Sequence, residues 1–184
     1  MRIIAGELKG RRLMTPQDNR VRPTTDKVKE AVFSMVQSYL PDGVVIDCFA
    51  GTGSLGLEAV SRGARHVYFI DKDKASIRLV KENVAYCGVG DRATILWADY
   101  ERALGKVDQQ ADVIFLDPPY DAGIIEDVIG CIIEKDRLAE DGIIVCEHSF
   151  YDSMPEEISG LTVLKSKKYG KIGITVYHRP IEED

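Results

Sequence analysis

The chain has 184 residues, of which 45% are hydrophobic and 29% are charged, with a net charge of −6. This composition is typical of a globular protein, and the length suits one domain spanning residues 1–184. No apolar run approaches the roughly 20 residues that cross a bilayer, and the first residues do not resemble a signal peptide, so we expect a cytoplasmic protein with no membrane partner.

The charge is unevenly distributed along the chain. Residues 1–30 contain eight basic and four acidic residues, residues 165–179 contain five basic and no acidic residues, and the stretch between them is acidic. If the two basic ends lie close together, they form a patch suited to nucleic-acid phosphates. The candidate phosphate contacts, each of which could equally be a solvated surface residue, are Arg11, Arg12, Arg22, Lys167 and Lys168.

The N-terminal third of the chain begins with turn signals and then becomes helical. Residues 3–5 and 11–14 flank Gly6 and Gly10 and predict a small β-hairpin. With the polar loop that follows, this hairpin makes residues 1–23 a basic N-terminal extension. A helix is expected to start within 24–26, at good capping residues, and its apolar positions from Val28 to Tyr39 lie on one face.

The rest of the chain alternates between strands and helices. Helices are predicted at 55–61, 74–86 and 124–133, and strands at 44–48, 67–70, 93–97, 113–116, 143–146, 161–164 and 172–177. This alternation predicts a Rossmann-like, doubly wound α/β fold with a mostly parallel, seven-stranded sheet and an antiparallel last strand. Such sheets bind ligands beyond the carboxyl ends of their strands.

A glycine-rich turn follows the first of these strands. Gly51, Gly53 and Gly56 fit the pattern GxGxxG, which permits a tight turn and a close approach of the backbone to a ligand. Asp71 lies 20 residues after Gly51 and can accept hydrogen bonds from both hydroxyls of a ribose. The combination indicates an adenosine-containing cofactor, although GxGxxG alone does not say which one.

Further carboxylates favour S-adenosylmethionine over a dinucleotide. Asp47 precedes the glycines and would be unfavourable beside a pyrophosphate but favourable near a sulfonium and an ammonium group. Asp99 could reach an adenine amino group or could be a plain loop acid. The predicted cofactor-binding set, which includes two residues inside the turn, is Asp47, Phe49, Ala50, Gly51, Gly53, Asp71 and Asp99.

The tetrapeptide Asp117, Pro118, Pro119 and Tyr120 follows directly on an apolar strand and is the candidate catalytic loop. An exocyclic base amine is a poor nucleophile because its lone pair is delocalised into the ring. The carboxylate of Asp117 and the carbonyl of Pro118 can each accept one N–H of the amine, which makes the lone pair more available. The prolines stiffen the loop, and Tyr120 offers a flat face for an extruded base.

With these residues in view, the chain resembles the bacterial 16S ribosomal RNA guanine-N2 methyltransferases over nearly its whole length. The resemblance rests on residues 1–6, 9–13, 22–30, 33, 47–53, 61–64, 117–120 and 169–170, with Asp71 where a longer Glu is expected. It implies the class I methyltransferase fold, S-adenosylmethionine as methyl donor, N2 of a guanine as acceptor, and ribosomal RNA in an assembling small subunit as partner. Asp117 and Pro118 would hold the amine and Tyr120 the base.

Three other functions remain open from the sequence. An amino-methylase of DNA adenine-N6 or cytosine-N4 shares the cofactor turn and the loop, but such enzymes carry a further target-recognition segment. A non-catalytic ribosome-binding module with the same fold would have no need for an intact Asp117. A nicotinamide-dependent dehydrogenase lacks support, because no constellation suited to hydride transfer is evident.

Overall fold

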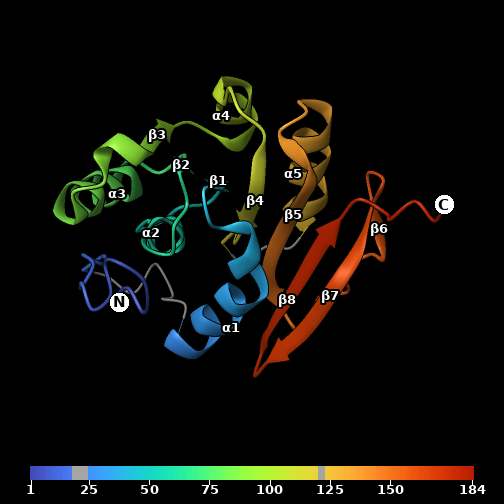
Figure 1. Cartoon of the computed structure of the whole chain (residues 1–184), viewed down its shortest axis with the longest axis horizontal. Helices are drawn as coiled ribbons and strands as arrows, with labels where there is room; N and C mark the ends of the chain where they lie inside the picture. The colour runs from blue at the N-terminus through green and yellow to red at the C-terminus, as the bar shows by residue number, and fades with distance from the viewer. Residues whose placement is uncertain (18–24, 120–122) are drawn as a thin grey trace.

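A computed structural model describes residues 1–17, 25–119 and 123–184, and it is built on one sheet of eight strands (Figure 1). The strand order is β3-β2-β1-β4-β5-β8-β7-β6. The strands are β1 (Val44–Asp47), β2 (His66–Asp71), β3 (Ala93–Trp97), β4 (Ala111–Leu116), β5 (Leu138–Ser149), β6 (Glu157–Ile158), β7 (Leu161–Tyr169) and β8 (Ile172–His178). Strands β1 to β5 are mutually parallel, whereas β8, β7 and β6 are added with antiparallel pairings.

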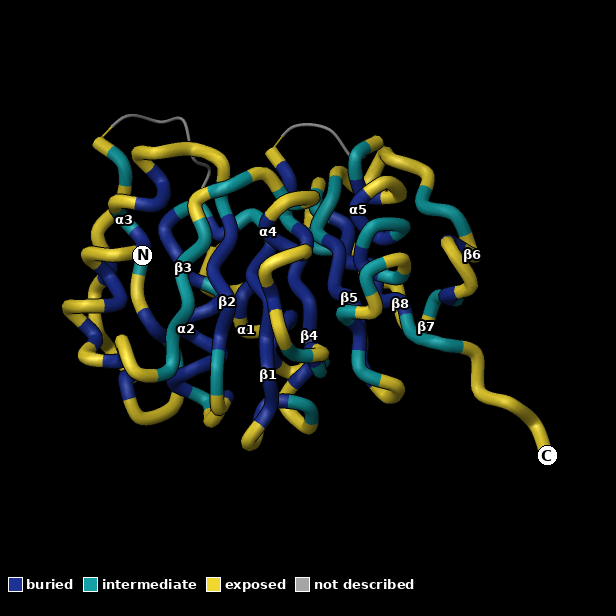
Figure 2. The backbone as a smooth tube through the Cα atoms, turned by 90° about the horizontal axis from the view of Figure 1, so that it is seen from above, coloured by how far each residue is buried: buried dark blue, intermediate teal, exposed yellow. Residues whose placement is uncertain are grey.

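Helices cover both faces of this sheet. One face carries α1 (Asp26–Val36), α2 (Ser54–Ser61) and α3 (Lys74–Cys87), and the other carries α4 (Tyr100–Lys106) and α5 (Gly123–Glu134), as Figure 1 shows. Buried residues form one apolar cluster on each side, and Figure 2 shows the central strands as the most continuously buried part. Strands that are buried on both faces read as apolar runs, which is why β1 and β4 were recognisable in the sequence.

The predicted α/β fold is confirmed, with two corrections at its margins. The sheet has eight strands rather than seven, because Ser159 and Gly160 take positive φ angles and fold residues 157–158 back onto β7 as the short β6. The expected N-terminal hairpin is reduced to one isolated antiparallel bridge between Arg2 and Arg12. The antiparallel position of the last strand is confirmed by the pairing of β8 with β5.

The polar backbone groups of the N-terminal segment bond partly to one another and partly to α2. The carboxylate of Glu58 accepts hydrogen bonds from the N–H groups of Ile4 and Ala5, and Ser61 bonds to Ala5 and Leu8. These contacts place the segment against the helix that follows the glycine-rich turn. In the part of the chain that the structure describes, no helix is long and apolar enough to cross a membrane.

Candidate functional site

Three carboxylates meet at the carboxyl edge of the sheet. Asp71 ends β2, Asp47 ends β1, and Asp117 follows β4, and these three strands are neighbours in the order β2-β1-β4. The chain leaves β1 toward α2 on one face and leaves β4 toward α5 on the other, so the strand order reverses here. In open α/β sheets this reversal is where ligands bind.

Asp71 supports the glycine-rich turn directly. Its Oδ2 accepts a hydrogen bond of 2.9 Å from the Gly51 N–H, and its Oδ1 accepts one of 2.9 Å from the Asp73 N–H. Gly51 and Gly53 have φ angles of 58° and 84°, which residues other than glycine rarely adopt. Gly53 is also the N-cap of α2, so the turn and the start of this helix are fixed together.

The third glycine of the motif has a different task, which is close packing of α2 on the sheet. A Cβ atom at Gly56 would lie 2.3 Å from Cε1 of Phe69, a residue of β2. The Gly56 N–H in turn donates a hydrogen bond of 3.0 Å to Oδ2 of Asp47. Gly56 therefore packs α2 against β2 and bonds it to β1, two of the three strands that end at the site.

Asp47 is a buried carboxylate whose pKa is raised well above the ordinary value. Its side chain is 2% exposed. Burial raises its pKa from the ordinary 3.8 to about 7, with further upward contributions from the negative charges of Asp117 and Asp71, while the Gly56 N–H opposes the shift. The influence of both neighbours on Asp47 indicates that the three carboxylates share one electrostatic environment.

The candidate catalytic loop also begins with a carboxylate whose pKa is raised by burial. Asp117 is half-buried, Pro118 is buried and Pro119 is exposed. Burial raises the pKa of Asp117 to about 6. Tyr120, the fourth predicted residue of the loop, lies outside the described residues.

The remaining predicted cofactor residues lie around the same edge. The N–H of Ala50 donates to the carbonyl of Ile70, which ties the turn to β2. The ring of Phe49 packs against that of Tyr100 with centroids 6.4 Å apart. Asp99 is exposed and is the N-cap of α4, where its Oδ1 accepts the Arg102 N–H. Asp99 therefore has a structural role as a helix cap, which is close to the alternative of a plain loop acid that the sequence left open.

The predicted phosphate contacts that the structure describes lie on two separate elements, the N-terminal segment and β7. Arg11 donates to the carbonyl of Tyr86 near the end of α3, and Arg12 is exposed beside its bridge to Arg2. Lys167 and Lys168 are exposed on β7, and the Nζ atom of Lys168 lies 3.9 Å from the centroid of the Phe150 ring. Arg22 lies outside the described residues.

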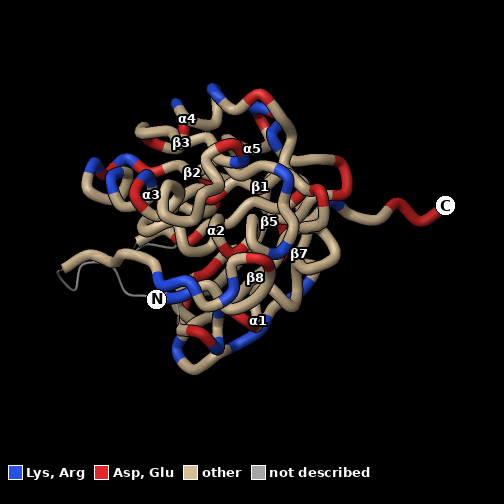
Figure 3. The backbone as a smooth tube through the Cα atoms, turned by 60° about the vertical axis from the view of Figure 1, so that its left-hand side comes forward, with Lys and Arg blue, Asp and Glu red and all other residues tan. Residues whose placement is uncertain are grey.

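The two basic stretches of the chain do meet, at a different place. A cavity of about 320 Å³ is lined by Thr25, Lys27 and Val28 at the start of α1 and by Tyr169, Gly170, Lys171 and Ile172 at the β7–β8 turn. Figure 3 shows the basic positions along the N-terminal segment and the acidic C-terminal tail. Lys27 and Lys171 are the basic residues that line this cavity, one from each basic stretch.

Sequence reasoning missed a buried ionic cluster beneath the glycine-rich turn. Nζ of Lys29 donates to Oγ of Ser54 (2.8 Å) and to the carbonyl of Arg2 (3.0 Å), and it lies 3.5 Å from Oε1 of Glu58. Lys29 and Glu58 are 1% and 0% exposed, and burial lowers the pKa of the lysine. The signal was present, because Lys29 shares the helical stripe of Val32, Phe33 and Val36.

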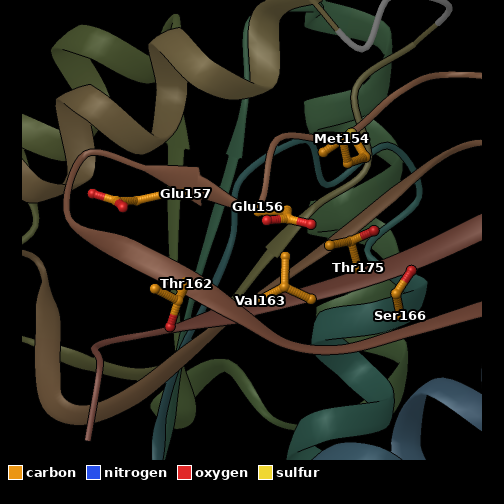
Figure 4. Close-up of a pocket in the computed structure, with 7 residues that line it drawn as sticks. All are labelled: Met154, Glu156, Glu157, Thr162, Val163, Ser166 and Thr175. Atoms are coloured by element: carbon orange, nitrogen blue, oxygen red, sulfur yellow. The ribbon is translucent and has the colours of Figure 1, made fainter.

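A second cavity lies away from the carboxylates. Its volume is about 670 Å³, and Figure 4 shows its lining by Met154, Glu156, Glu157, Thr162, Val163, Ser166 and Thr175. These residues belong to strands β6, β7 and β8 and to the loop before β6. None of the predicted site residues that the structure describes lines it. Among the described residues there is also no group of three or more His, Cys, Asp or Glu side chains that could hold a metal ion.

A doubly wound sheet with this order, a glycine-rich turn after β1 and acidic residues at the ends of β1 and β2 defines the α/β methyltransferase fold. The solved structure of the "Putative methyltransferase yhhF from Escherichia coli" superposes with a TM-score of 0.87 at 30% sequence identity, covering 97% of each chain. The chain belongs to the family described as "Conserved hypothetical protein 95", whose model matches residues 1–178, and this family includes the ribosomal RNA small subunit methyltransferases D. The resemblance predicted from the sequence is confirmed.

Two relatives illustrate the breadth of this family. "Putative rRNA methyltransferase YlbH" of Bacillus subtilis (strain 168) is 40% identical over 182 residues, which are 97% of this chain and 99% of that protein. "Ribosomal RNA small subunit methyltransferase D" of Escherichia coli (strain K12) is 31% identical over 179 residues, with coverage of 97% and 90%. The similarity therefore spans the N-terminal segment and the β7–β8 region as well as the central sheet.

Proposed function

We propose that this protein transfers a methyl group from S-adenosylmethionine to the exocyclic N2 amine of a guanine in small-subunit ribosomal RNA. The observation that carries this proposal is the position of Asp117 beside Asp47 and beside the turn that Asp71 supports, at one edge of the sheet. The names of the relatives support ribosomal RNA as the substrate.

The residues present fit S-adenosylmethionine better than they fit a dinucleotide. Asp47 and Asp117 are carboxylates whose charged forms are disfavoured by burial, so a nearby cation would stabilise them. A pyrophosphate would instead add negative charge to this cluster. When bound, S-adenosylmethionine supplies an electrophilic methyl group on a positively charged sulfur. The site therefore suits a cationic ligand that also carries a ribose.

Each predicted cofactor residue then has a role that its contacts support. Each carboxylate oxygen of Asp71 accepts one backbone N–H, and the remaining lone pairs are suited to ribose hydroxyls. The backbone of Gly51 and Gly53, with Ala50, forms the surface of the turn, and Phe49 provides an apolar wall. Asp99 uses one oxygen for its cap on α4, which leaves the other for an adenine amino group.

The catalytic role that we propose for Asp117 is positioning and proton acceptance. Its carboxylate accepts one N–H of the guanine amine, and the carbonyl of Pro118 accepts the other, which directs the nitrogen lone pair toward the methyl group. As the new N–C bond forms and the C–S bond breaks, the nitrogen must lose one proton. A carboxylate with a pKa of about 6 can hold that proton and release it to water. Pro119 stiffens the loop, and the stacking role of Tyr120 stays a prediction.

We also propose that residues 1–184 work as one methyltransferase domain, with residues 1–23 as its N-terminal extension. The hydrogen bonds from Ile4, Ala5 and Leu8 to α2 support this division, because they attach the extension to the helix that starts at the glycine-rich turn.

Transfer of a tritiated methyl group tests the proposal. The substrates are small ribosomal subunits and small-subunit RNA from cells that lack this protein, with double-stranded DNA alongside, and the product nucleoside is identified by mass spectrometry. We expect label in N2-methylguanosine from the RNA or the subunits. Label only in DNA would contradict the proposal in favour of a DNA amino-methylase, and the absence of transfer to any substrate would contradict catalysis.

A further inference from the structure

A pair of exposed aromatic side chains lies just after β5. Phe150 is 42% exposed and Tyr151 is 78% exposed, and their rings meet edge to face with centroids 5.8 Å apart. The Nζ atom of Lys168 lies 3.9 Å from the centroid of the Phe150 ring, within the range of a cation–π contact. The two exposed aromatic rings can stack on flat groups of a ligand, and the lysine beside them can pair with its negative charge.

The aromatic pair lies at the same edge of the sheet as Asp117. Strand β5 is parallel to β4, with Cys146 opposite Leu116, so Asp117 is level with residue 147 and Phe150 follows three residues later. At about 3.3 Å per residue this is an offset of roughly 10 Å along the strand. That offset corresponds to about three stacked nucleotides of 3.4 Å each.

The β7–β8 turn brings positive charge to the pair. Ile172 pairs with both Ser149 and Tyr169, and the N–H of Phe150 donates to the carbonyl of Lys171, so the turn lies beside the aromatic rings. Residues 165–171 contain four lysines and no acidic residue. Lys171 also lines the cavity of about 320 Å³ that the turn shares with Lys27 and Thr25 of the α1 region.

This combination of features favours RNA over a protein as the occupant. Lysine is depleted at the centre of protein–protein interfaces, where apolar contacts dominate. Exposed aromatic rings interleaved with lysines are instead the pattern by which proteins bind single-stranded nucleic acid, with bases stacked on rings and phosphates paired with lysines. The charge of the turn complements a polyanion directly.

We infer that Phe150 and Tyr151, together with Lys168 and Lys171, form a stacking platform that binds the single-stranded RNA adjacent to the target guanine. The inference rests on the proposed function, whose RNA-binding surface it names. The rings stack on flanking bases, and the lysines pair with the phosphates between those bases. The platform thereby holds the strand whose guanine enters the site at Asp117.

The platform is tested with the double variant Phe150→Ala/Tyr151→Ala, the single variant Tyr151→Ala and Lys168→Ala. The matched controls are Tyr86→Ala and Lys106→Ala, which remove an exposed aromatic and an exposed lysine near the ends of α3 and α4, at the opposite edge of the sheet. The probe is a fluorescein-labelled single-stranded RNA of about ten nucleotides that contains guanine, a length within the site sizes of single-strand binders. Fluorescence anisotropy gives the RNA Kd, and calorimetry gives the Kd for S-adenosylhomocysteine.

We expect the double variant to raise the RNA Kd by about 5- to 100-fold and Tyr151→Ala to raise it less, with no change in the Kd for S-adenosylhomocysteine. Lys168→Ala should lower the slope of log K against log salt by about one. Because Tyr151 is mostly exposed, its variant tests the platform even where Phe150→Ala disturbs packing.

RNA affinity that stays at the wild-type value in the double variant, or that falls equally in the controls, would overturn the inference. Lost binding to small-subunit ribosomal proteins with unchanged RNA binding would overturn it in favour of a protein partner. If the wild-type protein methylates RNA and the platform variants bind RNA normally, the platform is refuted and the proposed function stands. Wild-type protein that neither binds nor methylates RNA would contradict the proposed function itself.

Discussion

The carboxylate of Asp71 accepts a hydrogen bond of 2.9 Å from the backbone N–H of Gly51, across the 20 residues that separate the end of β2 from the glycine-rich turn. One side chain thus supports the turn and also ends the strand where a ribose is expected to bind. We therefore propose that Asp71 links the geometry of the turn to the affinity for the cofactor.

Asp71→Ala is expected to weaken S-adenosylmethionine binding by about 10- to 100-fold, because hydrogen bonds to a charged group contribute about 1.5–3 kcal/mol each. Calorimetric titration with S-adenosylhomocysteine measures the loss. The matched control is Asp73→Asn, which keeps an N-cap acceptor for Ser76 at the same edge and should bind as the wild type does. Equal affinities for Asp71→Ala and the wild type would refute the assigned role.

Asp47→Asn is expected to stabilise the protein at neutral pH while it weakens cofactor binding. Asparagine keeps an acceptor for the Gly56 N–H but removes a buried charge. Since folding raises the pKa of Asp47 from 3.8 to about 7, the protonated form is favoured in the native state, and its stabilising contribution is lost as pH rises from about 4 to about 7. The free energy of unfolding at pH 8 should therefore be higher in the variant, by at most about 4 kcal/mol at 1.36 kcal/mol per pKa unit.

Urea denaturation between pH 4 and pH 8 checks this expectation, with the exposed Asp91→Asn as the control. A variant whose stability falls with rising pH as steeply as that of the wild type would show that Asp47 is not the titrating group.

Lys29→Met is expected to destabilise the protein by about 3–5 kcal/mol, because it leaves the buried Glu58 without its ammonium partner. Glu58 would keep the N–H groups of Ile4 and Ala5 and the nearby Arg62 guanidinium. Adding Glu58→Gln to Lys29→Met should recover part of the loss. Urea denaturation gives the free energies, and hydrogen exchange of residues 1–14 reports whether the N-terminal segment loosens; equal stabilities for Lys29→Met and the wild type would count against the ionic cluster.

Much of this arrangement was predictable from local sequence patterns. Gly51, Gly53 and Asp71 carry their signal in short-range spacing, and the buried strands β1 and β4 are apolar runs. The edge position of Asp117 follows from its place directly after β4 in a parallel sheet. These features depend on neighbours in the chain or on the general rules of the fold.

Most of the features that the sequence did not reveal depend on contacts between distant segments. Gly6 and Gly10 suggested a hairpin, but the nearby backbone donors of Ile4 and Ala5 bond to Glu58, more than 50 residues away. Helix α4 is short and contains Gly105, so it lacks a recognisable apolar period. Lys29 lies in the apolar stripe of α1, but the polar partners that surround its ammonium group, Ser54 and Glu58, come from α2.

Methyl transfer is expected to depend on pH through Asp117. The carboxylate must be ionised to accept an N–H of the amine, and burial raises its pKa to about 6. Because a bound cation lowers this pKa, the fall through about pH 6 is expected in kcat/KM for S-adenosylmethionine, which reports the free protein, and it approaches a tenfold loss per pH unit below that. Initial rates between pH 5 and pH 8.5, with circular dichroism as the control for folding, measure the profile, and a flat profile down to pH 5 in folded protein would be inconsistent with this role.

The most direct measurement of the central claim is single-turnover methyl transfer by Asp117→Ala, with the cofactor Kd measured in parallel. We expect a loss of at least about 10²-fold in the rate of transfer, as for removal of a group aligned with the reacting atoms, with cofactor affinity close to that of the wild type. Transfer at the wild-type rate in this variant would contradict the catalytic role of Asp117.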